Sequence, residues 1–355
     1  MTTLAFGAPR RAAAREFGAS IWTIMVKELR SRMRGRRAFI VLTVYLGILA
    51  LITYGVYLVV APTARDAAGV GFNAFGNANV SSIIGQTIFT LLSIFQLILV
   101  CFIAPAFTSG QISLEREKQT LDLLISTPMR PGAIVIGKLF AALAFVFLMI
   151  VAALPISAIV LMYGGASVDD LVRQQLVLLA TALALGSIGL FYSALLKRTQ
   201  AATVLTYITV LGLALGTAML YVFWTVLLTT NDDGVGFGPP ERAPEQLLYV
   251  NPGVAMLDVV ANTEPGGFGG IAGMLSELRN DGGAFGGVEV DEFGQPLGDV
   301  STTGYWWPRY AITVGALAVL LTLASIRLVV PAGMRFAFRR RRQIRLPDEL
   351  QELQP

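Results

Sequence analysis

Six runs of apolar residues, each long enough to cross the hydrocarbon core of a bilayer, dominate this chain. A spanning helix needs about 20 mainly apolar residues, because its backbone polar groups must be satisfied within the segment itself. Only 14% of the residues are charged, whereas soluble domains contain about 25%. The sequence therefore predicts an all-α integral membrane protein with six transmembrane helices, at residues 38–60, 83–107, 137–162, 174–196, 201–229 and 306–330.

Charge is distributed unevenly among the connections between these spans. Residues 1–37 carry nine Lys and Arg against two acidic residues, whereas residues 230–305 carry twelve acidic residues against two Arg. Lys and Arg mark the cytoplasmic side of a membrane protein, so we expect both termini in the cytoplasm. The basic clusters beside the spans are expected to contact membrane lipids. Nucleic-acid binding is not expected, since no aromatic and basic interleaving accompanies them.

These patterns divide the chain into five parts. Residues 1–37 form a cytoplasmic N-terminus with an amphipathic elbow helix, and residues 38–229 hold spans one to five. Residues 230–305 form an extracytoplasmic Gly-rich acidic segment with 16 of the 36 glycines, 306–330 the sixth span, and 331–355 a basic cytoplasmic tail. Within the external segment, residues 244–262 can form a short helix or re-entrant pair. Aromatic residues near the outer span ends are expected to anchor at the headgroup level, namely Tyr221, Trp224, Tyr305, Trp306 and Trp307.

Several kinds of chemistry are excluded by residues that the chain lacks. It has no histidine, which removes His-containing nucleophile pairs and zinc sites, and its single cysteine, Cys101, cannot form an intrachain disulfide. No ionisable residue lies well inside a span, so a proton relay across the membrane is not supported. We predict no metal site and no cofactor site, and energy for any transport is expected to come from another protein.

One stretch, Gly132–Lys138, has the G-x-x-x-x-G-K spacing of a phosphate-binding loop. That loop needs a preceding strand and a Ser or Thr at its eighth position, but Leu139 stands there and the segment runs into an apolar helix. We therefore interpret the match as coincidence and expect no ATP hydrolysis by this chain. Lys138 is interpreted as the cytoplasmic end of span three, with its ammonium group reaching the interface.

The segment just before this stretch is predicted to form a short amphipathic helix, residues 113–126, on the cytoplasmic side. Leu114, Leu121, Leu124 and Ile125 would form its apolar stripe, and Pro128 would stop it. From the pattern alone, this helix either receives a partner protein or lies on the lipid surface.

The same segment carries a recognisable string, E-x-E-x-x-T-L-x-L-L followed by Thr-Pro and Gly-Lys. It resembles the signature of type-two ATP-binding-cassette (ABC) permeases at Glu115, Glu117, Thr120, Leu121, Leu123, Leu124, Thr127, Pro128, Gly137 and Lys138. That family usually has Gly where this chain has Gln119. The resemblance extends to an Asn-Pro element within 247–260 and to the elbow before span one, with Trp22, Lys27, Glu28 and Arg30.

The resemblance implies a permease subunit, an exporter, in the inner or cytoplasmic membrane of a bacterium or archaeon. It pairs with a second permease copy or paralogue, and separate ABC ATPase subunits hold the ATP and magnesium. The implied docking residues are Glu115, Arg116, Glu117, Thr120, Leu121, Leu124, Thr127 and Pro128, with a minor contact at Lys197 and Arg198. The alternative is a non-transporting complex that transmits mechanical force or remodels the envelope. The spans hold too few polar residues to separate the two functions.

Overall fold

The computed structural model describes residues 18–19, 21–27, 36–69, 76–120, 131–230, 245–261 and 306–329. These residues form helices and turns, and no strand occurs among them. Six helical segments within these ranges are long and apolar enough to span a membrane, which confirms the predicted spans. They are α2 (Arg36–Gly69), α3 (Gly76–Thr108), α6 (Pro131–Ala152) continued by α7 (Leu154–Leu161), α8 (Val168–Leu195), α9 (Thr199–Leu211) continued by η1 (Gly212–Gly216) and α10 (Thr217–Thr230), and α13 (Trp306–Val329).

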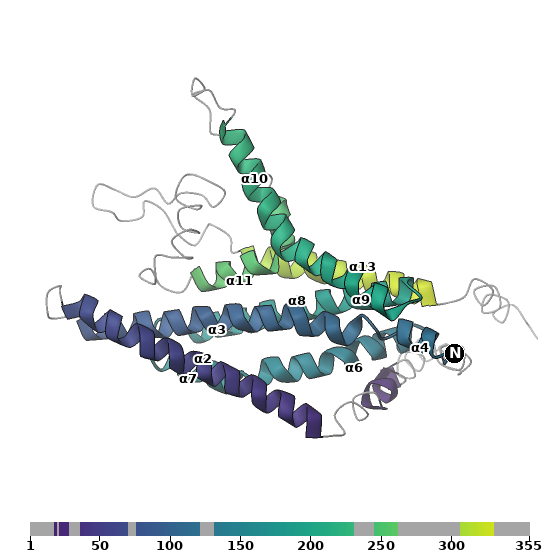
Figure 1. Ribbon diagram of the computed structural model, residues 1–355, viewed down its shortest axis with the longest axis horizontal. Coiled ribbons are helices and arrows are strands. Elements are labelled where there is room, and N and C mark those ends of the chain that lie inside the picture. The colour runs from purple at the N-terminus through teal and green to yellow at the C-terminus, as the bar shows by residue number, and fades with distance from the viewer. Residues whose placement is uncertain are drawn as a thin grey trace, which may run out of the picture.

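Helix α8 lies at the centre of the bundle and packs against α3, α6, α9 and α13. In Figure 1, α2, α3 and α6 run roughly along the long axis of the molecule, whereas α10 leaves the other helices at a steep angle. Two glycines of α8 permit close packing: a Cβ at Gly186 would lie 2.7 Å from a methyl group of Leu143, and one at Gly189 would lie 2.2 Å from Thr108 Oγ1. Apolar side chains of α3, α6, α8 and α13 form the larger core around this helix.

Polar side chains also join α8 to its neighbours within this apolar core. Gln174 donates to Gln96 of α3 (3.3 Å), so Gln96 is a helix–helix hydrogen-bonding residue. Farther along α8, Thr181 shares a 2.8 Å hydrogen bond with Tyr310 of α13. Hydrogen bonds of this kind contribute about 0.6–2 kcal/mol each between membrane helices.

The helix boundaries differ from the predicted spans, most clearly at span three. Its helix begins at Pro131 rather than at residue 137, because proline is well tolerated in the first helical turn. The prediction placed Lys138 at the end of the span and so excluded residues 131–136, although these residues are apolar and belong to the helix. As a result, Lys138 lies two turns inside α6 and not at its end.

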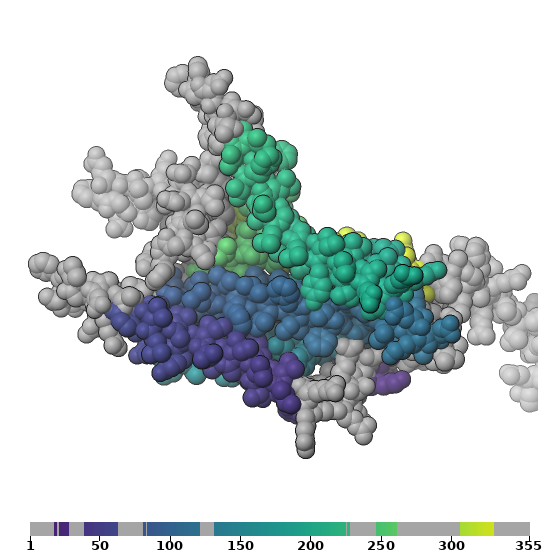
Figure 2. Space-filling view, viewed as in Figure 1, coloured from purple at the N-terminus to yellow at the C-terminus, as the bar shows by residue number. Residues whose placement is uncertain are grey.

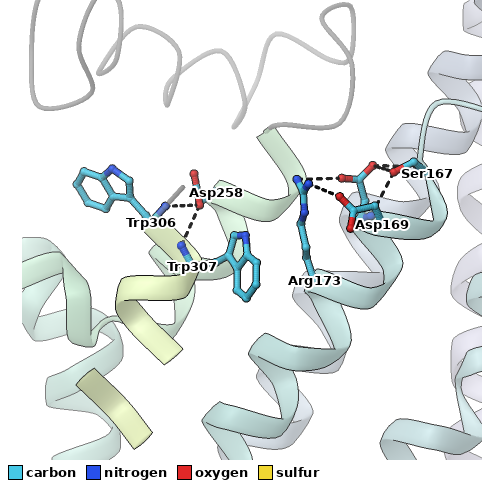
Figure 3. Close-up of polar contacts among 7 residues, drawn as sticks. Ser167, Asp169, Arg173, Asp258, Trp306 and Trp307 are labelled. Carbon is cyan, nitrogen blue, oxygen red and sulfur yellow. Dashed lines mark hydrogen bonds and ion pairs between the residues drawn. The ribbon is translucent and has the colours of Figure 1, made fainter. Parts of the chain in front are cut away.

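The short helix predicted within residues 244–262 is present as two pieces, η2 (Glu245–Val250) and α11 (Pro252–Ala261). Helix α11 packs against α3, α8 and α13. Its Asp258 carboxylate accepts hydrogen bonds from the first two amides of α13, at Trp306 (2.8 Å) and Trp307 (3.0 Å), as Figure 3 shows. An anionic group at a helix N-terminus is favourable because the orphan amides and the helix dipole are both satisfied there.

Two aromatic residues predicted as membrane-surface anchors are instead buried. Tyr221 and Trp306 form a small cluster with Leu248, and the Trp306 ring packs edge-on against Tyr249 with 5.6 Å between centroids. The prediction was wrong for these two residues because η2 covers them, which the order of residues along the chain could not indicate. Trp224 is exposed, as expected of an anchor.

At the same end of the bundle, α8 begins with a capping box. Ser167 Oγ accepts from the Asp170 amide, and the Asp170 carboxylate accepts from the Ser167 amide. Arg173, one turn later, pairs with the carboxylate of Asp169 (Figure 3). Such caps typically contribute about 1 kcal/mol each and fix where the helix begins.

Candidate coupling site

The candidate site is built where α3 turns into the short helix α4 (Ser113–Glu117). The chain between them makes a tight turn at residues 109–112, with the Ser109 amide bonded to the Pro105 carbonyl (2.9 Å). Helix α4 is therefore a direct continuation of span two and not a separate element on a flexible loop.

Helix α4 ends after Glu117, short of the predicted end at residue 126, and residues 121–126 lie outside the described residues. The amide of Thr120 donates to the Glu115 carbonyl (2.9 Å) and the amide of Gln119 to the Arg116 carbonyl (3.1 Å). This pair of bonds is a Schellman motif, which requires a left-handed residue and usually takes Gly there. Gln119 supplies it with a φ of 56°. Sequence reasoning interpreted Gln119 as a helix residue, so this part of the prediction was wrong.

The N-terminus of α4 is bound by a side chain from another helix. Its own N-cap residue, Ile112, offers no side-chain acceptor. Instead, Ser193 Oγ of α8 accepts from the amides of Ile112 (2.8 Å) and Ser113 (3.0 Å). All three residues are buried, so this hydroxyl satisfies two amides that would otherwise lie buried without acceptors.

The far end of α4 is bound to span five. Glu117 Oε1 accepts from the amide of Thr199 (2.8 Å), the first residue of α9, whose own N-cap Arg198 makes no capping bond. Close by, the hydroxyl groups of Ser109 and Thr203 are 3.0 Å apart and share a hydrogen bond. A carboxylate at this helix N-terminus is stabilised by the helix dipole.

A third connection joins α4 to span three. Lys138 Nζ lies 2.6 Å from Glu115 Oε1, and the Lys138 side chain is almost completely buried. The prediction that Lys138 reaches the membrane interface was therefore wrong. Its partner is 23 residues away in the sequence, and hydropathy gives no sign of such a pairing.

The phosphate-loop spacing at Gly132–Lys138 now has a structural explanation. Helix α6 runs through both glycines, so no loop of free amides is present there, as predicted. A Cβ at Gly137 would lie 3.0 Å from Ile24 Cγ2, so this glycine makes room for the helical segment 21–27. Lys138 serves the ion pair with Glu115. Of the elbow residues, Trp22 and Lys27 are exposed, whereas Glu28 and Arg30 lie outside the described residues.

The structure thus has, within its described ranges, six helices long and apolar enough to span a membrane, a short helix fixed to three of them, and the helix α11 before the last span. A comparison of the sequence with family models agrees with this plan. The model described as "ABC-2 family transporter protein" matches residues 22–340. The chain belongs to the ABC-2 transporter family. It is a multi-pass membrane permease subunit, and this family implies an ABC ATPase partner in general. No individual curated protein matches the sequence.

In this ABC-2 permease, the predicted docking residues fall into three groups. The partly buried Glu115 pairs with Lys138, and the exposed Glu117 accepts a hydrogen bond from the Thr199 amide. Exposed or partly exposed positions of the two predicted contact segments are Leu114, Arg116, Lys118, Gln119, Thr120, Lys197 and Arg198. The remaining predicted residues, Leu121, Leu124, Thr127 and Pro128, lie outside the described residues.

Sequence reasoning missed Ser193, Ser109 and Thr203, which hold the site together. The available signal was small: a serine and threonines near the basic end of apolar spans. Among the described residues, no group of His, Cys, Asp or Glu side chains could hold a metal ion.

Proposed function

We propose that this permease exports its substrate and that α4, with the turn at Lys197 and Arg198, is the surface on which separate ABC ATPase subunits dock. The observation that carries the proposal is the set of bonds from α4 to three spans: Glu115 to α6, Ser113 to α8 and Glu117 to α9. Because α4 also continues α3, a displacement of this five-residue helix moves four spans together.

The exposed surface around α4 suits a protein partner. Leu114 is 43% exposed and is the apolar residue that α4 presents outward among charged and polar neighbours. The turn at Lys197 and Arg198 lies beside it, because Glu117 binds Thr199 directly. An apolar side chain at the centre with a polar rim is the usual composition of a protein–protein interface.

The proposal also states on which side of the membrane α4 lies and which subunit binds ATP. Both termini and α4 lie in the cytoplasm, supported by the excess of Lys and Arg at this end of the spans. ATP and magnesium bind the ATPase subunits, and this chain hydrolyses no ATP. A second permease copy or paralogue completes the transporter in a bacterial or archaeal cytoplasmic membrane, in contact with its lipids.

The proposal is tested by placing a charge at the exposed apolar position. The permease is co-expressed with its cognate ABC ATPase, and both co-purification and stimulated ATP hydrolysis are measured for Leu114→Asp. We expect both to fall at least about tenfold, since losing a central apolar anchor costs over 1 kcal/mol. Purified permease without the ATPase is expected to hydrolyse no ATP.

A matched control is Val168→Asp, which places the same charge at an exposed apolar residue at the opposite end of α8. Unchanged ATPase binding and stimulation in Leu114→Asp, or an equal loss in Val168→Asp, would show that α4 is not the docking surface.

A further inference from the structure

Span five is not one continuous α-helix. Between α9 and α10 the chain makes a π-helical turn, η1, in which the Thr217 amide donates to the Gly212 carbonyl, five residues back. Figure 1 shows α9 lying along the bundle and α10 leaving it after this turn, and Figure 2 shows α10 projecting from the body of the protein. Inserted π turns are among the recognised causes of sharp bends in helices and occur often at functional sites.

Close packing does not explain the two glycines that bound this turn. A Cβ at Gly212 or Gly216 would meet no atom within 4 Å, in contrast to Gly186 and Gly189 of α8. Glycine in a helix interior costs about 1 kcal/mol relative to alanine because it loses more backbone entropy. Both glycines therefore lower the rigidity of span five at the position of the π turn.

A side chain from outside span five binds this turn. Asn251 is 1% exposed, and its Nδ2 donates to the Ala214 carbonyl (2.9 Å) and to Thr217 Oγ1 (2.9 Å). Thr217 Oγ1 in turn donates to the Leu213 carbonyl (2.6 Å). Backbone carbonyl groups freed by an irregular turn in a membrane helix must accept hydrogen bonds from neighbouring side chains. Here the Thr217 hydroxyl binds the Leu213 carbonyl and the Asn251 amide binds the Ala214 carbonyl.

The oxygen atom of the Asn251 side-chain amide binds the beginning of α11. Asn251 Oδ1 accepts from the amides of Gly253 (2.8 Å) and Val254 (3.2 Å), which makes Asn251 the N-cap of α11. At the other end of this ten-residue helix, Asp258 binds the first amides of α13. The π turn is therefore connected through Asn251 and α11 to the start of span six.

Space for movement is available beside the turn. A half-open apolar groove of about 500 Å³ lies between α3, α9, η1 and α11, and its walls include Ile98, Phe102, Leu211, Leu215, Pro252 and Met256. Because this side of the turn borders a groove and not a close-packed core, the turn can change its angle there without compressing filled space.

We propose that η1 is a hinge between α9 and α10, and that the two hydrogen bonds from Asn251 Nδ2 restrain it at one angle. When these bonds break, α10 swings relative to α9, and α11 and the start of α13 are released from span five. The use of this hinge in transport rests on the proposed function, since α9 is bound to α4 through Glu117. The hinge itself is a property of the permease alone.

The test measures the distance across the hinge in purified permease in lipid nanodiscs, without any ATPase. Spin labels are placed at Val204→Cys and Val222→Cys, both exposed positions, after Cys101→Ala removes the only native cysteine. A straight helix would separate these backbone positions by about 27 Å at 1.5 Å per residue. With Asn251 present, we expect one narrow distribution with a mean below that limit.

The decisive variant is Asn251→Asp, which keeps both acceptor bonds to α11 but loses both donors to the hinge. We expect its distance distribution to broaden and its mean to shift. Thr217→Val removes one acceptor of Asn251, keeps side-chain volume and leaves the N-cap intact. It should shift the mean distance in the same direction as Asn251→Asp, but by a smaller amount. If Asn251→Asp does not fold, Thr217→Val is the variant that tests the hinge.

The matched control is Thr209→Val, which removes a hydroxyl from α9 that binds Tyr192 and the Leu205 carbonyl. Its distribution should equal that of the parent. Unchanged distances in the folded Asn251 or Thr217 variants, or an equal broadening in Thr209→Val, would overturn the hinge. Because no ATPase is present, this result is independent of whether α4 is the docking surface.

Discussion

The ion pair between Glu115 and Lys138 allows the sharpest test of how α4 is held. The two atoms are 2.6 Å apart, and the side chains are 24% and 4% exposed, respectively. At an effective dielectric constant of about 20, the attraction at this distance is about 6 kcal/mol before the cost of removing both charges from water. Most of that attraction is offset by desolvation, so the net stabilisation is small while the loss of one partner is costly.

The unequal burial of the two charges predicts unequal effects. Glu115→Gln removes the negative charge that faces the almost completely buried ammonium of Lys138 and should cost about 3–4 kcal/mol, within the range for a broken buried pair. Lys138→Met leaves the carboxylate of Glu115, whose side chain is 24% exposed although its Oε2 atom is buried, and should cost about 2 kcal/mol because its desolvation penalty is smaller. The double variant should cost only about 1 kcal/mol, since no uncompensated charge remains.

The assay is the thermal unfolding midpoint of the purified permease in detergent, measured for the parent, both single variants and the double variant. The expected order, from most to least stable, is parent, double variant, Lys138→Met and Glu115→Gln. A double variant whose loss equals the sum of the single losses would show that the two residues do not interact. A Lys138→Met variant less stable than Glu115→Gln would refute the argument from burial.

Three further predictions concern the same end of the bundle. Gln119→Gly relieves a left-handed residue that costs about 1 kcal/mol and should slow amide hydrogen exchange over residues 116–120, whereas faster exchange would contradict the Schellman assignment. Ser193→Ala leaves two buried amides without an acceptor and should cost about 1–3 kcal/mol, measured by thermal unfolding against a Ser187→Ala control. Gly189→Ala places a methyl group 2.2 Å from Thr108 Oγ1 and should destabilise, whereas Gly315→Ala, with no atom within 4 Å, should be neutral or stabilising.

The sequence identified the segment that forms the candidate site, but it did not identify the contacts that this segment makes. The string around Glu115 and Glu117 indicated the family and the segment, and family membership is confirmed. The same string gave both glutamates a role in binding a partner, whereas in the structure Glu115 pairs with the buried Lys138 and Glu117, although exposed, binds the Thr199 amide of the neighbouring span. A charged residue on a short helix has the same sequence pattern whether it faces a partner or a neighbouring span.

The sequence by itself determined the six spans and the charge of the segments that connect them. The free energy of moving a residue from water to hydrocarbon depends mainly on that residue and its near neighbours. Only the tertiary structure decided which groups pair across helices. Glu115 and Lys138 are 23 positions apart, Ser113 and Ser193 are 80 apart, and Asn251 binds a turn 34 to 37 positions before it. Such contacts follow from the packing of α8 against its neighbours and from the π turn in span five. The local hydropathy of an apolar run is the same with or without them.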